Sequence, residues 1–177
     1  MSKIILYDQE NLHGDGKVFT DSVLDLEKEV FSDKARSLKV EGKHWVAYTC
    51  TNYTGQFIVY GAGDHLNLEN LDRKIQSLRL VKEDLQDPEI KLFEHINYGG
   101  KERDITGAAD DLKDAGFNNL VSSHHVKRGV WVLYENKYYN GNRLITFLGD
   151  QWVNYRNKGC NDKLSSLKPL LSTDFKV

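Results

Sequence analysis

Two six-residue segments in the second half of the sequence carry closely spaced oxygen donors. They read Asn118-Asn119-Leu120-Val121-Ser122-Ser123 and Asn161-Asp162-Lys163-Leu164-Ser165-Ser166. Each begins with two Asn or Asp residues and ends with two serines. Amide, carboxylate, hydroxyl and backbone carbonyl oxygens are the donors that Ca²⁺ prefers, about six to eight at a time. The segments are therefore candidate calcium loops, although Asn-Asn and Ser-Ser pairs are also common turn formers.

The segments that must position these loops repeat four times along the chain. Each repeat has an aromatic residue, a glycine seven positions later and a serine much further on. The aromatic residues, spaced 41, 45 and 41 positions apart, are Tyr7, Tyr48, Phe93 and Tyr134, the glycines are Gly14, Gly55, Gly100 and Gly141, and the serines are Ser37, Ser77, Ser123 and Ser166. Four coincident spacings indicate an internal repeat.

The residue pattern in each repeat predicts β-structure. Around each aromatic residue the sequence alternates apolar and polar or is β-branched, as in Lys3–Tyr7, which is typical of a half-buried strand. The glycine ends a hairpin-like stretch, where it adopts a positive φ cheaply. About four strands per ~40 residues favour an antiparallel sandwich over a propeller, whose blades would need more residues. Only Leu66–Leu71 and Ala108–Lys113 could form helical turns, and Trp45 and Trp131 are expected in the core.

The longer spacing between the second and third repeats contains the best linker. The segment Val81–Pro88 is rich in charged residues and ends in one of only two prolines in the chain. Such a composition is typical of a boundary between domains. We therefore predict a first domain at 1–82, a linker at 83–88 and a second domain at 89–177, with two repeats in each domain.

The composition restricts the class of protein. Hydrophobic residues make up 40% of the 177 positions and aromatic residues 11%, which is enough for a folded core. A net charge of -2 provides no electrostatic footprint for nucleic acid or anionic lipid. No apolar run approaches the ~20 residues that span a bilayer, so no transmembrane segment is expected. The absence of a signal-peptide pattern predicts a cytoplasmic location with Cys50 and Cys160 as free thiols, and extracellular release is the second option.

Taken together, the four repeats resemble the βγ-crystallin superfamily from about Lys3 to Leu170. The resemblance is to two-domain non-lens members, such as the crystallin-like part of amphibian epidermis differentiation-specific proteins. It implies an all-β fold of two βγ-crystallin-like domains, each a sandwich of two Greek-key motifs. In that fold the aromatic residue covers a folded hairpin, the glycine permits the fold, and the serine pins it through backbone hydrogen bonds.

The resemblance also implies a set of calcium ligands. Family members bind Ca²⁺ through a loop of the form Asn/Asp, Asn/Asp, any, any, Ser/Thr, Ser, and two such loops in one domain share two sites. The implied ligands are early side chains, third-residue carbonyls, fifth-residue hydroxyls and a hairpin carbonyl. They are Glu94, Asn118, Asn119, Leu120 and Ser122 in the third repeat, and Glu135, Asn161, Asp162, Lys163 and Ser165 in the fourth. Which serine completes which site stays open.

The first domain departs from this loop pattern. Its aligned loops are residues 32–37 and 72–77, with Arg36 and Gln76 where the family has a hydroxyl. A guanidinium has five donors and no acceptor, so Arg36 cannot ligate a cation. Gln76 could offer an oxygen but is longer than the serine that the loop accommodates, and Arg73 replaces an Asn or Asp. We predict that the first domain binds calcium weakly or not at all, and that the second binds up to two ions.

The sequence favours a non-enzymatic calcium-binding structural protein. No nucleophile, base and orienting group occur together in a motif. The adjacent His124 and His125 would point to opposite faces of a strand, so they are a poor pair for one metal ion. The acidic cluster Asp104, Asp110, Asp111 and Asp114 is better explained by a solvated face than by catalysis.

Two other functions fit the same fold. One is a carbohydrate-, membrane- or partner-recognition module, as in amphibian relatives where this unit precedes a pore-forming region; residues 171–177 would then begin a linker. The other is a lens-type refractive protein, whose usual richness in Arg, Met or Cys is missing here. The partners considered are calcium, a glycan or membrane, and a second copy in a domain-paired homodimer or larger complex.

Overall fold

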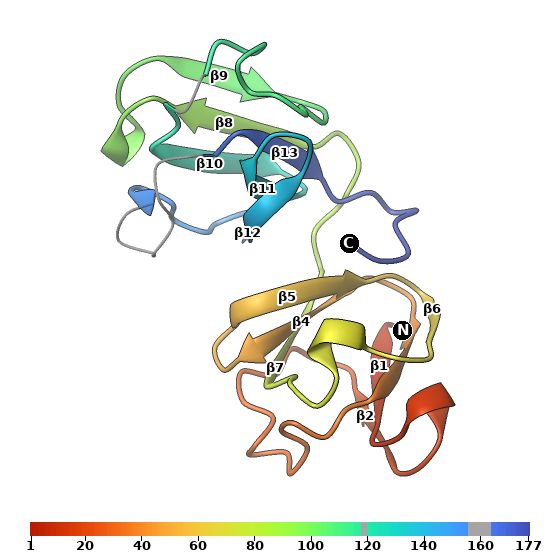
Figure 1. Ribbon diagram of the computed structural model, residues 1–177. Coiled ribbons are helices and arrows are strands. Elements are labelled where there is room, and N and C mark those ends of the chain that lie inside the picture. The colour runs from red at the N-terminus through yellow and green to blue at the C-terminus, as the bar shows by residue number, and fades with distance from the viewer. Residues whose placement is uncertain (118–119, 156–163) are drawn as a thin grey trace. The chain divides into compact units, whose positions relative to one another are not determined.

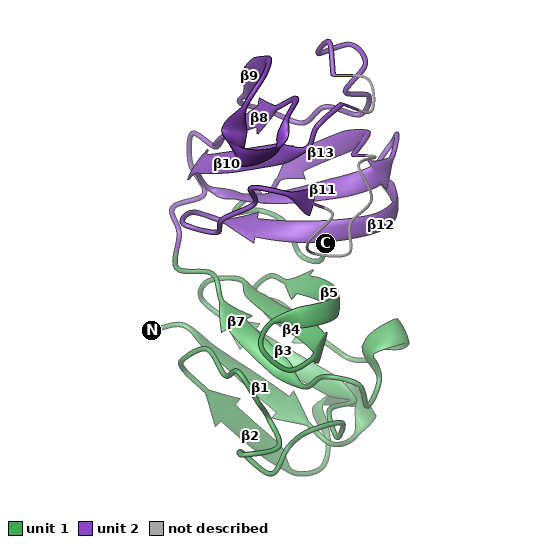
Figure 2. Cartoon of the chain, turned by 90° about the vertical axis from the view of Figure 1, so that its left-hand side faces the viewer, with its two compact units in different colours: residues 1–82, 172–177 green, residues 83–171 purple. Residues whose placement is uncertain are grey.

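The chain divides into two compact units. The computed structural model describes residues 1–117, 120–155 and 164–177. Unit 1 contains residues 1–82 and 172–177, and unit 2 contains residues 83–171 (Figure 2). The sequence analysis assigns residues 172–177 to the second domain, whereas the structure places them with unit 1, because they pair with one of its strands.

Unit 1 consists of two antiparallel sheets (Figure 1). The first sheet has the strand order β2-β1-β3-β6, and the second has the order β5-β4-β7. The strands are β1 (Lys3–Tyr7), β2 (Gly16–Phe19), β3 (Ser37–Glu41), β4 (Trp45–Cys50), β5 (Thr54–Tyr60), β6 (Gly63–His65) and β7 (Ser77–Leu80), with short 3-10 turns η1 (Glu10–Leu12) and η2 (Glu69–Leu71). Alternate residues of β1 are buried, as the sequence pattern predicted.

Unit 2 repeats this arrangement with two three-stranded sheets. Their strand orders are β10-β8-β9 and β12-β11-β13. The elements are β8 (Glu89–Phe93), η3 (Ile96–Tyr98), β9 (Glu102–Ile105), β10 (Ser123–Arg128), β11 (Val130–Asn136), β12 (Asn140–Phe147) and β13 (Ser166–Pro169). Among the described residues of unit 2 the strand pairs are antiparallel, which confirms the all-β fold predicted from the repeats.

The two repeats of each unit exchange chain segments. In unit 1, β6 of the second repeat pairs with β3 of the first, with His65 opposite Leu38. In return, Val23 of the first repeat forms a bridge to Leu78 of β7 in the second. The equivalent pairs in unit 2 are His124 with Trp152 and Ala109 with Leu167. Because each repeat completes the other's sheet, the pair of repeats is the folding unit.

Each unit has its own hydrophobic core. Trp45 and Trp131 occupy equivalent positions, three residues before a hairpin tyrosine, and both are fully buried as predicted. Trp45 packs in the cluster of unit 1, and Trp131 packs in the cluster of unit 2. Of the two predicted helical turns, Leu66–Leu71 contains η2, whereas Ala108–Lys113 forms no helix because Ala109 is paired with Leu167.

The four hairpins fold over in the same way. The glycine of each has a left-handed backbone, with φ values of 80°, 84°, 77° and 81° at Gly14, Gly55, Gly100 and Gly141. The fourth and fifth residues after each aromatic residue are also left-handed, which the sequence did not predict. These residues are Asn11, Leu12, Asn52, Tyr53, Asn97, Tyr98, Tyr138 and Tyr139. Non-glycine residues in this conformation are strained, so something must hold them there.

A buried serine holds each folded hairpin. The Ser123 hydroxyl donates to the His95 carbonyl at 2.6 Å and accepts the Tyr98 N–H at 3.1 Å. The other three serines make the same pair of bonds, Ser37 to Gln9 and Leu12, Ser77 to Cys50 and Tyr53, and Ser166 to Asn136 and Tyr139. All four serines are completely buried. The pinning role implied by the resemblance is thus confirmed.

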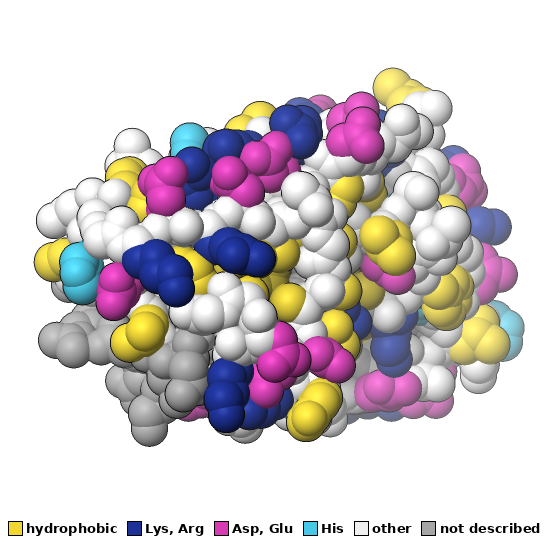
Figure 3. All heavy atoms as spheres, turned by 90° about the horizontal axis from the view of Figure 1, so that it is seen from above, with side chains coloured by type: hydrophobic (Ala, Val, Ile, Leu, Met, Phe, Trp, Pro, Cys, Tyr) yellow, Lys and Arg dark blue, Asp and Glu magenta, His cyan; other side chains and the backbone are white. Residues whose placement is uncertain are grey.

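The surface and the helices give two further observations. Lys and Arg side chains are interspersed with Asp and Glu side chains on the face shown in Figure 3, with no large area of one sign. Across the described ranges, no helix has the length and apolar character needed to cross a bilayer.

Candidate metal site

The fifth residue of each loop is attached to the hairpin of its own repeat. In unit 2 the Ser122 N–H donates to the Phe93 carbonyl at 3.0 Å, and the Ser165 N–H donates to the Tyr134 carbonyl at 2.9 Å. In unit 1 the same bonds run from Arg36 to Tyr7 at 2.8 Å and from Gln76 to Tyr48 at 2.9 Å. Arg36 and Gln76 therefore occupy the positions of the two serines.

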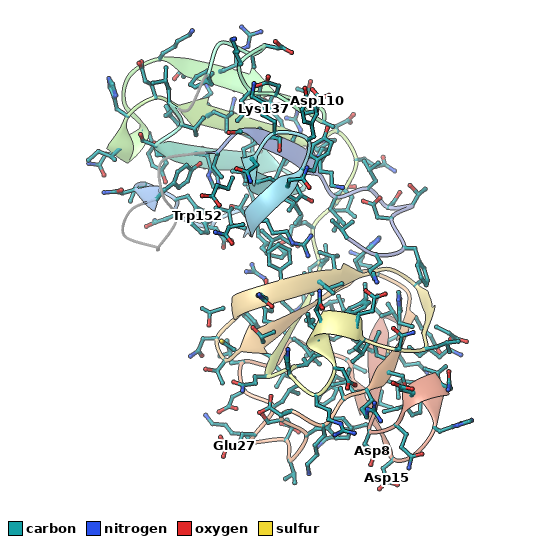
Figure 4. All side chains as sticks on the ribbon, viewed as in Figure 1. Asp8, Asp15, Glu27, Asp110, Lys137 and Trp152 are labelled. Carbon is teal, nitrogen blue, oxygen red and sulfur yellow. The ribbon has the colours of Figure 1, made fainter. Side chains whose placement is uncertain are left out.

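The structure attaches one predicted ligand of each loop next to the predicted hairpin ligand of the same repeat. The bond from Ser122 to Phe93 places Ser122 beside Glu94, the next residue of the hairpin, and Ser165 lies beside Glu135 in the same way. Glu94 is fixed within its hairpin, because its carboxylate accepts the Lys101 N–H at 3.2 Å. Asp8 accepts the Asp15 N–H in the corresponding hairpin of unit 1, where both side chains are labelled in Figure 4.

The remaining predicted ligands are only partly within the described structure. Leu120 is exposed at the surface. Outside the described residues lie Asn118, Asn119, Asn161, Asp162 and Lys163. Residues 1–117, 120–155 and 164–177 contain no group of three or more His, Cys, Asp or Glu side chains able to hold a metal ion. The predicted loops depend instead on amide, hydroxyl and backbone oxygens, which are donors of the kind that Ca²⁺ accepts.

A lysine that the sequence analysis did not consider lies immediately before the loop of the third repeat. The Lys101 ammonium donates to the Gly116 carbonyl at 3.3 Å and lies 5.5 Å from the centroid of the Phe117 ring. Lys101 follows the hairpin glycine directly in sequence. A positive charge beside the loop would weaken its attraction for a cation.

In unit 1 the guanidinium of Arg36 bridges two carboxylates. Its Nη2 lies 3.0 Å from Glu10 Oε1, and its Nε lies 3.1 Å from Asp72 Oδ1. Glu10 belongs to the hairpin of the same repeat, and Asp72 begins the loop of the other repeat. The hydrogen bond to Asp72 and the two negative charges raise the pKa of Arg36 above its ordinary value. The guanidinium thus supplies the positive charge between these carboxylates.

Gln76 makes the reciprocal contact across the two loops. Its amide Nε2 donates to the Asp33 carboxylate, at 3.3 Å from Oδ1 and 3.2 Å from Oδ2. The loops also exchange backbone bonds, from Asp33 to Ile75 at 3.2 Å and from Arg73 to Ala35 at 2.9 Å. The fifth residue of each loop therefore donates to a carboxylate of the other loop. Arg36 and Gln76 were recognisable from the loop pattern, whereas Glu10 was not predicted as a partner. An arginine in a ligand position is the signal that could have pointed to a nearby carboxylate.

The family assignment follows from the same repeats. The Beta/Gamma crystallin family model matches residues 3–81 and 89–170. The chain belongs to the beta/gamma crystallin family. This beta/gamma crystallin is 34% identical to the epidermal differentiation-specific protein of Cynops pyrrhogaster over 170 residues, a match that covers 96% of the chain and 50% of the relative. The chain therefore spans half the length of that relative.

Other relatives match different shares of the chain. Human Beta-crystallin A3 is 28% identical over 180 residues, covering 95% of the chain and 83% of the relative. A solved beta gamma crystallin from Ciona intestinalis is 32% identical, covers 46% of the chain and 99% of its own, and has a TM-score of 0.44. The solution structure of Protein S complexed with calcium is 20% identical, covers 96% and 100%, and has a TM-score of 0.41. The resemblance to the superfamily is confirmed, and the protein is of the structural crystallin type.

The acidic cluster of this beta/gamma crystallin includes surface ion pairs. Lys137 donates to the Asp111 carboxylate at 2.6 Å, and the Lys113 N–H donates to it at 2.9 Å. These bonds hold the pKa of the Asp111 carboxyl below its usual value. Figure 4 shows Lys137 near Asp110, whose carbonyl accepts the Tyr138 N–H. These contacts attach the loop that contains Asp110 and Asp111 to the fourth hairpin, so the role of these two residues is structural.

The two adjacent histidines face opposite sides of β10, as predicted. His124 is fully buried, whereas His125 is exposed. The His124 ring nitrogens lie 2.5 Å from the Tyr155 hydroxyl and 2.8 Å from the Thr146 hydroxyl. Both ring nitrogens of His124 therefore have a hydrogen-bond partner within the core of unit 2.

Proposed function

We propose that this beta/gamma crystallin is a non-enzymatic structural protein that binds calcium mainly through unit 2 and is stabilised by it. One contrast carries the proposal. The fifth loop positions have the same backbone attachment in both units, yet they hold hydroxyls at Ser122 and Ser165 and nitrogen donors at Arg36 and Gln76. The two hydroxyls can offer an oxygen to a cation and the Arg36 guanidinium cannot, while the Gln76 amide is engaged as a donor to Asp33.

The electrostatics of unit 1 support the same division. The Arg36 guanidinium already lies between Glu10 and Asp72, at 3.0 and 3.1 Å. A calcium ion in that position would meet a fixed positive charge within a few ångströms, where like charges repel strongly. In unit 2 the corresponding residues Ser122 and Ser165 carry neutral hydroxyls, and their backbone N–H groups are bonded to the residues that precede Glu94 and Glu135 in the hairpins. Hydroxyl oxygens fit a hard cation.

Calcium that binds only the folded state would stabilise unit 2 by mass action. At a hundredfold excess over the dissociation constant the gain in unfolding free energy is about 2.7 kcal/mol. Such a gain corresponds to a shift of roughly 10 °C or more in the melting temperature of a domain of about 100 residues. A melting curve is therefore a sensitive readout of binding.

The test is a calorimetric calcium titration of the metal-stripped chain, with melting curves before and after. We expect about two sites and a higher melting temperature for unit 2. The variants S122R and S165R, which copy the residue found at position 36, should each lose calcium heat and stabilisation. S32R is the matched control, because it adds the same charge to a loop of unit 1.

Three results would contradict the proposal. Wild-type stabilisation by calcium in both S122R and S165R would show that the ligands are assigned wrongly. Heat corresponding to four sites would show that Arg36 and Gln76 do not exclude the ion. No heat and no shift in melting temperature would exclude calcium as a ligand of this chain.

A further inference from the structure

Residues 172–177, called here the return segment, extend the second sheet of unit 1. The segment lies along β5, an outer strand in the order β5-β4-β7. The Val59 N–H donates to the Val177 carbonyl at 2.8 Å, and the Val177 N–H donates back to Val59 at 2.9 Å. The Gly61 N–H donates to the Phe175 carbonyl at 2.7 Å. This is the pairing by which an extended peptide adds a strand to a sheet edge.

A buried histidine receives the aromatic side chain of the return segment. The Phe175 ring stacks on His65, with centroids 4.2 Å apart and planes 20° apart. His65 is only 5% exposed, and its Nε2 lies 2.9 Å from the Gly61 carbonyl. The ring of Tyr60 packs edge-on against the same histidine at 4.8 Å. Burial lowers the pKa of His65, which favours the neutral form of its ring.

Two glycines make room for the backbone of the return segment. A Cβ on Gly61 would lie 2.1 Å from the Asp174 carbonyl oxygen, and one on Gly63 would lie 2.7 Å from the Phe175 ring. Gly63 has a φ of 136°, which by itself favours glycine, but Gly61 has no such backbone requirement. The close approach of the segment is therefore the structural reason for a glycine at position 61.

Polar groups fix the register of the segment. The buried His44 donates through Nε2 to the Asp174 carbonyl at 2.6 Å. The Lys176 ammonium lies 3.1 Å from the Glu69 carboxylate, at the exposed surface. Unit 1 thus provides a strand edge, an aromatic contact, a carbonyl donor and a carboxylate. Each of them meets a different part of Asp174–Val177.

We propose that this surface of unit 1 is a peptide-binding site, and that it takes the return segment of a second copy of the chain as well as the chain's own. The groups described above come from residues 44–69 and contact residues 174–177, so the contacts do not depend on which copy donates the segment. Reciprocal exchange would give a symmetric dimer. The tethered segment competes at an effective concentration in the millimolar range, so exchange is concentration-dependent. The inference concerns unit 1 and is independent of calcium.

A peptide experiment tests the site directly. The probe is the labelled peptide Ser-Thr-Asp-Phe-Lys-Val, and binding is followed by fluorescence anisotropy in the presence of a calcium chelator. The full-length variant F175A should bind this peptide roughly 3- to 10-fold more tightly than the wild type, because its own segment has lost the aromatic contact. A peptide with alanine in place of phenylalanine should bind F175A more weakly by a similar factor.

The matched control blocks the site from the protein side. In F175A/G61A the added methyl group would occupy the place of the Asp174 carbonyl, so peptide binding should be lost. Equal binding by F175A and F175A/G61A would overturn the proposal, as would no binding by F175A. If G61A disturbs folding in a melting curve, the alanine peptide decides the question on F175A without the second substitution: equal affinity of the two peptides for F175A overturns the proposal.

The second copy is tested by light scattering without calcium. Wild-type chain should shift from monomer toward dimer between about 10 µM and about 1 mM, near the effective concentration of a short tether. The variant G61A should remain monomeric over this range. A wild type that stays monomeric, or a dimer that G61A also forms, would overturn exchange through this site.

Discussion

Replacing Ser123 with alanine removes the two hydrogen bonds that attach the third hairpin to β10. The side chain is completely buried, and its hydroxyl bonds the His95 carbonyl at 2.6 Å and the Tyr98 N–H at 3.1 Å. Alanine leaves the packing almost unchanged, but both backbone groups lose their partner. Tyr98 has a φ of 60°, so the hairpin also loses what holds a strained residue in place.

The expected loss can be worked out from these two bonds. Leaving a buried donor or acceptor unsatisfied costs about 1–3 kcal/mol. Because both hairpin groups lie near the surface, we take the lower part of that range for each, which gives a total of about 2–3 kcal/mol for S123A. In a domain of 60–100 residues each kcal/mol lowers the melting temperature by about 4–8 °C. Unit 2 should therefore melt roughly 10–20 °C lower.

Urea denaturation and hydrogen exchange check this prediction. The unfolding free energy of unit 2 should fall by the stated amount, and the Tyr98 amide should exchange faster. The variant S37A is the matched control, because Ser37 makes the same two bonds in unit 1, to Gln9 and Leu12. It should weaken unit 1 instead. A loss below about 0.5 kcal/mol in S123A, within the range of ordinary surface substitutions, would refute the pinning argument.

Two further predictions concern charged groups. In R36S, Glu10 and Asp72 lose their cation and the loop regains a hydroxyl, so calcium should raise the melting temperature of unit 1. The melting temperatures of the wild type and of R36K should not respond to calcium. The same response in all three proteins would contradict the role of Arg36. The pKa of Asp111 is lowered by Lys137, so its contribution to stability is present above the unfolded carboxyl pKa of about 3.9 and is lost as pH falls through the folded value. In D111N the urea midpoint of unfolding should fall less steeply as the pH is lowered from about 6 to about 2. A slope equal to that of the wild type would contradict this prediction.

The fold was predictable because each signature residue has a local physical reason. Gly100 is needed for its left-handed backbone, Ser123 for its hydroxyl, and Trp131 for its volume, and the same reasons recur in every repeat. The left-handed pair Asn97 and Tyr98 was not predicted. These residues adopt a conformation that their side chains disfavour, and only the distant serine holds them there.

The candidate metal site was predictable in part. The loop pattern identified the fifth positions, and the structure places Ser122 and Arg36 equivalently. The loop pattern did not identify Glu10 or Lys101. Both residues belong to hairpins and come close to a loop only because the hairpin folds toward it, which the spacing in the sequence does not show. Five of the ten predicted ligands, including Asn119, lie outside the described residues, and all ten stay predictions.

The return segment was not predictable from the sequence. Residues 172–177 are too short and too polar to indicate a strand, and their partner β5 ends at Tyr60, more than a hundred positions earlier. Gly61 has no sequence signature by itself, since the need for a glycine there comes from the carbonyl of Asp174, which follows unit 2 in the sequence. Such long-range pairings depend on tertiary context and leave little local trace.

The place of the return segment in the chain bears on synthesis at the ribosome. Unit 1 lacks its last stretch of sheet until the 89 residues from 83 to 171 have been made. At about 5–20 residues per second, that interval is roughly 4–18 s. During this time the edge of β5 has unpaired backbone groups, and such edges pair readily with other chains. The nascent protein would therefore be most prone to aggregate while unit 2 is being translated, and chaperone binding to β5 would be most useful then.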